Sequence, residues 1–109
     1  MDKRLHQIIR DVKLAFETMG IHINKIILFG SYAKGTANKC SDIDIAVISN
    51  DFKDMNLLRR FEFIGLALAK AKIMDPVEVR VYTEEEFETK REGTFVGDEI
   101  KAKGIKVML

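Results

Sequence analysis

The sequence predicts an α/β (α+β) fold, because helical and strand patterns alternate along one short chain. The chain opens with apolar residues spaced three and four apart, which is the pattern of an amphipathic helix. Short apolar runs rich in β-branched residues follow, and a second helical pattern separates two of them. We therefore expect one modest core built from both helices and strands.

The first half of the chain contains one expected helix and two expected strands. Residues 2–19 place apolar side chains on one helical face, and Gly20 suits the left-handed position that ends a helix. Residues 25–29 form a short apolar run that predicts a buried strand, and residues 43–48 form a second one. The polar segment 31–40 between the two strands has room for a short helix.

Residues 55–72 predict a second long helix, and Asp54 is its expected N-cap. Helical spacing selects the following expected buried stripe: Leu57, Leu58, Phe61, Ile64, Leu68 and Ala71.

The last part of the chain predicts a third strand, two helices and a fourth strand. Residues 77–82 alternate apolar with polar side chains, as a half-buried strand does. Thr83 and Glu86 have the spacing of a capping box, so we expect a helix to begin there. Residues 94–103 predict the last helix, and residues 105–108 predict the last strand.

Composition excludes several classes of protein. The 109 residues are 47% hydrophobic and 32% charged, a balance that excludes a disordered or low-complexity chain. The net charge is only +1, so long nucleic acids are not expected partners. No apolar run approaches the roughly 20 residues that span a bilayer. One cysteine and two histidines supply neither a disulfide nor a zinc site, and we expect a cytoplasmic protein without membrane association.

Gly30 and Ser31 follow the first predicted strand and form a candidate phosphate-binding turn. Backbone N–H groups at such a turn, with a helix start behind them, attract phosphate oxygens. Gly30 and Gly35 have the glycine spacing of a P-loop, but Thr36 and Ala37 occupy the positions where that motif requires Lys and then Ser or Thr. The segment is therefore not a P-loop, and on its own it does not differ from an ordinary loop.

Three acidic residues form a candidate metal site. Asp42 and Asp44 stand two residues apart, so in a strand their carboxylates share one face with Cα atoms about 6–7 Å apart. Paired divalent cations would relieve their repulsion, and oxygen ligands on a small site favour Mg²⁺. Glu78 points away from the face buried by its neighbouring valines, so it can join the two aspartates if its strand lies beside theirs. For the two aspartates, the alternative is a solvated strand end at which Asp42 caps a turn. For Glu78, it is an exposed residue paired across the strand with a Lys or Arg.

These residues resemble the minimal nucleotidyltransferases of the DNA polymerase β-like superfamily. That family has Gly-Ser, ten residues, and then Asp-x-Asp, and here Gly30 and Ser31 are followed by residues 32–41 and then by Asp42 and Asp44. The resemblance implies a small mixed sheet with helices packed on one side. It also implies that residues 1–109 form a single nucleotidyltransferase catalytic domain.

The resemblance also implies roles for the site residues. Gly30 and Ser31 would bind the β- and γ-phosphates, and Asp42 and Asp44 would bind two Mg²⁺ ions. Glu78 matches the third carboxylate, which ligates a metal or accepts the proton of the acceptor. Many relatives have Asp at this position, and Glu is one methylene longer.

The implied reaction is transfer of AMP from ATP to a hydroxyl group, with release of pyrophosphate. Larger relatives carry additional domains that present the acceptor, so we expect the acceptor here to come from a separate molecule. The resemblance points to the antitoxin of a toxin–antitoxin pair, which adenylylates a tyrosine of a helical HEPN-type toxin. Two alternatives stay open: transfer to a small hydroxyl compound such as an aminoglycoside, and a non-catalytic antitoxin that only binds its partner. The sequence leaves homo-oligomers open.

Other reactive or basic side chains carry no catalytic prediction. Arg59 and Arg60 are expected on a solvated helix face, and Lys34 is expected to face solvent. Cys40 has no adjacent His or cationic cluster that would activate its thiol.

Overall fold

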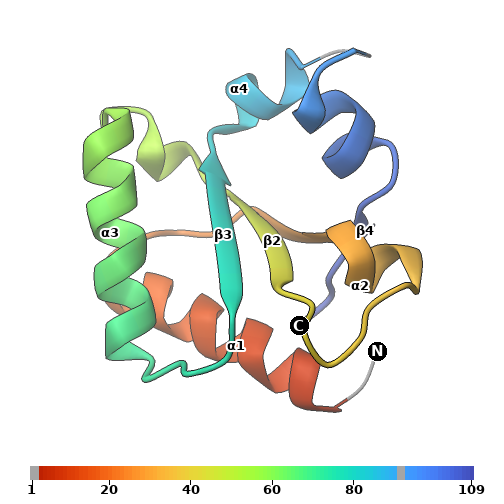
Figure 1. Ribbon diagram of the computed structural model, residues 1–109. Coiled ribbons are helices and arrows are strands. Elements are labelled where there is room, and N and C mark those ends of the chain that lie inside the picture. Colours follow the sequence, from red (N-terminus) through yellow and green to blue (C-terminus); the bar gives the residue numbers. More distant parts are fainter. Residues whose placement is uncertain (1–2, 91–92) are drawn as a thin grey trace.

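The computed structural model describes residues 3–90 and 93–109 and contains a four-stranded mixed sheet flanked by helices (Figure 1). The predicted helix start at residue 2 lies outside the described residues. The elements follow the chain in this order: α1 (Lys3–Thr18), β1 (Lys25–Phe29), α2 (Gly30–Lys34), β2 (Ile43–Ile48), η1 (Asn50–Phe52), α3 (Leu57–Lys70), β3 (Val77–Tyr82), α4 (Glu84–Glu88), η2 (Val96–Lys101) and β4 (Ile105–Lys106). Among the described residues, no helix is long and apolar enough to cross a membrane.

The strand order in the sheet is β3-β2-β1-β4. Strand β1 is antiparallel to both β2 and β4, whereas β2 and β3 are parallel and are joined through α3. A parallel pair needs such a crossover, because its two strands begin at the same end of the sheet. The predicted fold class and all three longer predicted strands are confirmed.

The two long helices pack on one face of the sheet (Figure 1). The predicted apolar stripe of α1 is buried there against side chains of β1, β2 and β3. Phe16 of α1 is fully buried, and its ring packs edge-to-face on Phe52 and Phe63, with centroids 6.2 and 5.1 Å away. These rings join α1, η1 and α3 into one core.

Helix α3 is shorter than predicted, and a different stripe of its surface is buried. It begins after Asn56, not Asp54, because the Asn56 side chain accepts a hydrogen bond from the Arg59 N–H. Ile64 and Ala67 are the buried apolar residues, with Leu68 and Ala71 partly buried beside them. The predicted stripe was wrong at Leu57, Leu58 and Phe61, which are 60–68% exposed.

Arg60 lies on the inward side of α3, and its predicted position on a solvated face was wrong. Its guanidinium donates to both oxygens of Glu86 at 2.7 and 3.0 Å and to the Phe52 carbonyl at 2.7 Å, and its Nε donates to the Met55 carbonyl. Glu86 also closes the predicted capping box with Thr83, which is confirmed. A single guanidinium therefore joins the segment before α3 to the start of α4.

Replacing Arg60 by Met is expected to lower the free energy of unfolding by about 1–2 kcal/mol, since the exposed part of Glu86 weakens the ion pair. The hydrogen bond from Arg60 holds the pKa of Glu86 below its ordinary value of 4.5. The stabilisation is therefore present above pH 4.5 and is lost as pH falls below that value. Urea unfolding between pH 3 and 7 measures both effects. An equal loss in the exposed control Arg59→Met would contradict this role.

Shorter elements cover part of the opposite face of the sheet. Phe87 of α4 and two residues of η2, Val96 and Ile100, pack there on side chains of β1 and β2. Residues 94–103 were predicted as a helix, but η2 is a π-helix of six residues, with the Ala102 N–H bonded to the Gly97 carbonyl. The predicted last strand 105–108 is reduced to two residues of β4.

Candidate active site

The sheet brings Asp44 and Glu78 side by side. Asp44 of β2 and Glu78 of β3 are directly opposite in the parallel register, so their side chains leave the same face of the sheet. Asp42 precedes β2 by one residue and is exposed. Its loop is ordered by Asn38, whose side chain accepts a hydrogen bond from the Cys40 N–H and whose own N–H donates to Ser41 Oγ. The adjacency of the two acidic strands, on which the metal-site prediction depended, is therefore present.

The acidic cluster changes the ionisation of Asp44. Partial burial, a hydrogen bond with Glu78 and the negative charges of Glu78 and Asp42 raise the pKa of Asp44 from 3.8 to about 6. Burial is the largest cause, and the like charges add to it. Burial and, after it, the neighbouring carboxylates therefore make the ionised form of Asp44 unfavourable, and a bound cation would offset that cost.

Gly30 brings the start of α2 against this cluster. Phe29, the last residue of β1, is opposite Asp44 in the antiparallel register, and α2 begins at the next residue. Gly30 has a φ of +71°, and a Cβ atom at this position would collide with the Asp44 carboxylate. Only glycine therefore allows the main chain to pass so close to Asp44. Ser31 follows in the first turn of α2, where no side chain caps the helix.

The residues present fit a divalent cation by the chemistry of their donors. Within the described residues, no three His, Cys, Asp or Glu side chains already stand together as a ligand set. Asp42, Asp44 and Glu78 nevertheless supply only carboxylate oxygens, the ligands that Mg²⁺ takes. The raised pKa of Asp44 comes first from burial and then from its acidic neighbours, and a cation would offset both. These three residues are the ones that would hold it.

Arg80 is a site residue that the sequence analysis missed. It follows Glu78 by two residues on the same face of β3, opposite the small Ala46, and its Nε lies 3.5 Å from a Glu78 carboxylate oxygen. Its guanidinium lies 4.5 Å from the centre of the Phe95 ring. Within the described part of the chain, the buried Nε of Arg80 has no hydrogen-bond partner. The two-residue spacing from Glu78 was the available signal.

Arg80→Met is expected to raise the pKa of Asp44 above about 6, because the Arg80 charge lowers that pKa in the intact protein. A ¹³C NMR titration of the Asp44 carboxyl, without divalent cations, measures this shift. Arg10→Met, on the exposed side of α1, is the control. An unchanged Asp44 pKa in Arg80→Met would show that Arg80 does not act on the cluster.

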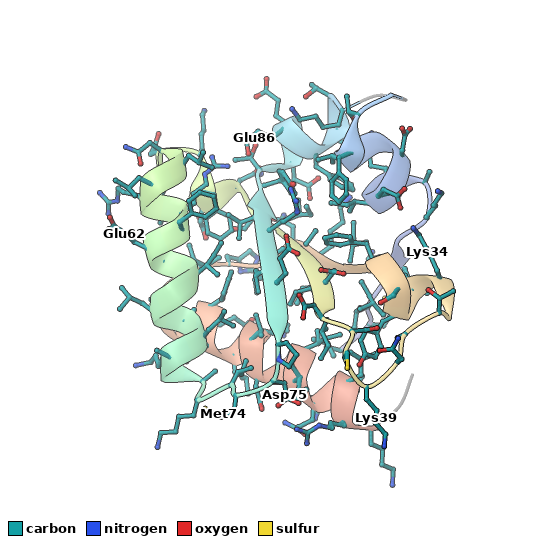
Figure 2. The ribbon with its side chains drawn as sticks, in the orientation of Figure 1. Lys34, Lys39, Glu62, Met74, Asp75 and Glu86 are labelled. Atoms are coloured by element: carbon teal, nitrogen blue, oxygen red, sulfur yellow. The ribbon has the colours of Figure 1, made fainter. Side chains whose placement is uncertain are left out.

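Lys34 and Cys40 have no catalytic contacts among the described residues. Lys34 extends from α2 toward η2 and forms an ion pair with Glu99 at 2.9 Å, so it joins two elements (Figure 2). Cys40 is exposed and free.

Comparison with known proteins defines the class of this chain. The model of the nucleotidyltransferase domain family matches residues 9–106. The chain belongs to this family, within the DNA polymerase β-like superfamily that the motif at residues 30–44 resembles, and it is a nucleotide-transferring enzyme. Among curated proteins, none matches the sequence significantly.

Solved structures share the fold. A candidate nucleotidyltransferase from Sulfolobus solfataricus is similar with a TM-score of 0.68 and 19% identity, over 94% of this chain and 78% of that one. A toxin–antitoxin crystal structure with AMP-PNP is similar with a TM-score of 0.50 and 23% identity, over 75% of this chain and 59% of that one. Both likenesses support the fold and the mixed sheet.

Proposed function

We propose that this protein transfers AMP from ATP to a tyrosine hydroxyl of a partner protein, and that the partner is a HEPN-type toxin. The observation that carries the proposal is the pairing of Asp44 with Glu78 on neighbouring strands, with the backbone of Gly30 against Asp44. Neighbouring carboxylates beside a glycine turn suit the binding of a nucleoside triphosphate together with its divalent cations.

Each site residue then has a defined role. Gly30 and Ser31 bind the β- and γ-phosphates through the start of α2, and Asp42, Asp44 and Glu78 hold two Mg²⁺ ions. When bound, Mg²⁺ lowers the pKa of the attacking hydroxyl and offsets charge on the departing pyrophosphate. The acceptor oxygen forms a bond to the α-phosphorus, and the bond from that phosphorus to the bridging oxygen breaks. The hydroxyl proton passes to Glu78 or to solvent.

The adenine nucleotide and the protein partner are supported by the toxin–antitoxin structure that shares the fold and contains AMP-PNP. The motif shared with minimal nucleotidyltransferases supports the same combination. A cytoplasmic location suits both ATP and a toxin partner.

The test of the proposed function is label transfer with Mg²⁺ from ATP carrying ³²P at the α- or the γ-position. Wild type and the double variant Asp42→Asn/Asp44→Asn are compared with cell extract and with any co-purifying protein as acceptors. We expect α-label in a protein band and none from γ-labelled ATP, and no transfer by the double variant. α-Label only in small molecules would favour a transferase for small hydroxyl compounds. No transfer from any of the four NTPs while a partner still co-purifies would favour a non-catalytic antitoxin.

A further inference from the structure

Strand β3 has an open edge next to the candidate active site. The Ile43 N–H bonds to the Pro76 carbonyl and the Ser49 N–H bonds to the Tyr82 carbonyl, so the even-numbered residues of this strand direct their main-chain groups toward β2. The main-chain groups of Val77, Val79 and Val81 consequently face the other side. Because β3 ends the strand order, no strand among the described residues pairs with that side.

A groove of about 420 Å³ follows this edge between β3 and α3. Apolar residues form most of its lining, and Glu78, Arg80 and Tyr82 line the rim nearest the active site. Leu57 and Phe61 of α3 line it while being 68% and 60% exposed. Figure 2 shows Glu62 of α3 pointing away from β3, whereas Arg60 of the same helix lines the groove.

The chemistry of the groove suits an extended polypeptide. Unpaired main-chain groups beside apolar pockets are what a peptide needs to add a strand to a sheet. The two arginines on the lining, Arg60 and Arg80, disfavour a polycationic small molecule such as an aminoglycoside. Glu78 belongs both to the groove and to the acidic cluster, so the groove leads directly to the candidate catalytic carboxylates.

We propose that an extended segment of the partner protein binds along the open edge of β3 as an additional strand and presents the acceptor tyrosine from it. This inference rests on the proposed function. Adjacent strands are about 4.8 Å apart, so the added strand would lie about 5 Å from Glu78 and about 10 Å from Asp44. The hydroxyl of a tyrosine on the active-site face can reach toward Asp44, whereas a serine side chain is too short to do so. Side chains on the opposite face would contact Leu57 and Phe61.

The probe is the peptide acetyl-Lys-Thr-Val-Tyr-Val-Thr-Lys-amide, titrated into ¹⁵N-labelled wild-type protein. The control peptide has the same sequence but is methylated on every main-chain nitrogen, so it has no main-chain N–H donor along either edge. We expect amide shift changes at Val77, Val79 and Val81 with the first peptide and none with the second. Leu57→Glu/Phe61→Glu should weaken peptide binding about tenfold or more, because both side chains lie in the groove. Leu66→Glu is the matched control, since Leu66 is 63% exposed on the same helix but outside the groove lining.

Equal binding of both peptides, shift changes away from β3, or the same affinity in the groove and control variants would overturn the proposal. A wild-type dimer that only the groove variant dissociates would also overturn it, because a second copy would then occupy the edge. Binding of Mg²⁺-ATP, followed in the same samples at residues 30 and 31, tests the proposed function separately. If wild type binds Mg²⁺-ATP but not the peptide at β3, only the proposed strand addition is overturned. If wild type does not bind Mg²⁺-ATP at residues 30 and 31, the proposed function is overturned.

Discussion

Asp44→Asn is expected to reduce nucleotidyl transfer by about 10³-fold or more while leaving the protein at least as stable as wild type. The loss follows because stabilisation of transition-state charge by bound cations contributes several kcal/mol. The stability follows from the pKa of Asp44, which rises to about 6 in the folded protein. A folded-state pKa above the unfolded value costs stability as pH rises from about 4 through 6. A neutral amide does not incur that cost.

Transfer kinetics and thermal unfolding at pH 7.5, with and without Mg²⁺, measure the two effects together. Asp54→Asn, which changes an exposed carboxylate before α3, is the matched control and should leave both unchanged. Mg²⁺ should raise the melting temperature of wild type more than that of Asp44→Asn. A destabilised but active Asp44→Asn protein would mean that Asp44 is a structural residue.

Gly30→Ala is expected to lower the free energy of unfolding by about 2–4 kcal/mol and to reduce transfer by about 10²-fold. An alanine at φ +71° is strained by about 1–2 kcal/mol, and its Cβ would also meet the Asp44 carboxylate. Relief of that collision must displace either the start of α2 or Asp44. A displacement of about 1 Å in a catalytic constellation is enough for the expected loss of rate.

Gly35→Ala is the matched control, because Gly35 has a similar φ of +75° and no atom near the position of an added Cβ. The difference between the two variants isolates the collision with Asp44. Chemical unfolding and transfer kinetics provide the comparison. Equal losses of stability and activity in both variants would mean that Gly30 is required only for its backbone conformation.

The strands were predictable because their burial patterns are simple. Both faces of β1 and β2 are covered, so their sequences are almost continuously apolar, while β3 at the edge alternates. Helix α3 was predicted less well because apolar residues occupy both its sheet-facing and its outer side. Its buried stripe includes Arg60, which a hydrophobicity pattern assigns to the surface because it is charged. Hydrogen bonds with Glu86 and with two main-chain carbonyls make the burial of Arg60 possible.

The acidic part of the candidate site was predictable because residue spacing in strands determines which side chains share a face. Asp44 and Glu78 needed only the adjacency of β2 and β3. Asp42 was expected in the same strand as Asp44, but it lies one residue before β2, in the preceding loop. Arg80 was missed because its role depends on the small Ala46 opposite it and on a ring, Phe95, from a distant segment. The groove at β3 was missed for a similar reason: open edges are a property of strand order, which the local sequence does not contain.

The most direct test of the central claim, that Gly30, Ser31 and the three carboxylates form one nucleotide and metal site, is paramagnetic broadening by Mn²⁺-ATP in ¹⁵N-labelled protein. We predict that the amide signals of residues 30, 31, 42, 44 and 78 broaden first, while signals from the outer side of α3 stay sharp. The double variant Asp42→Asn/Asp44→Asn should lose this pattern and keep its fold. Broadening centred elsewhere, or an unchanged pattern in the folded double variant, would contradict the assignment of the site.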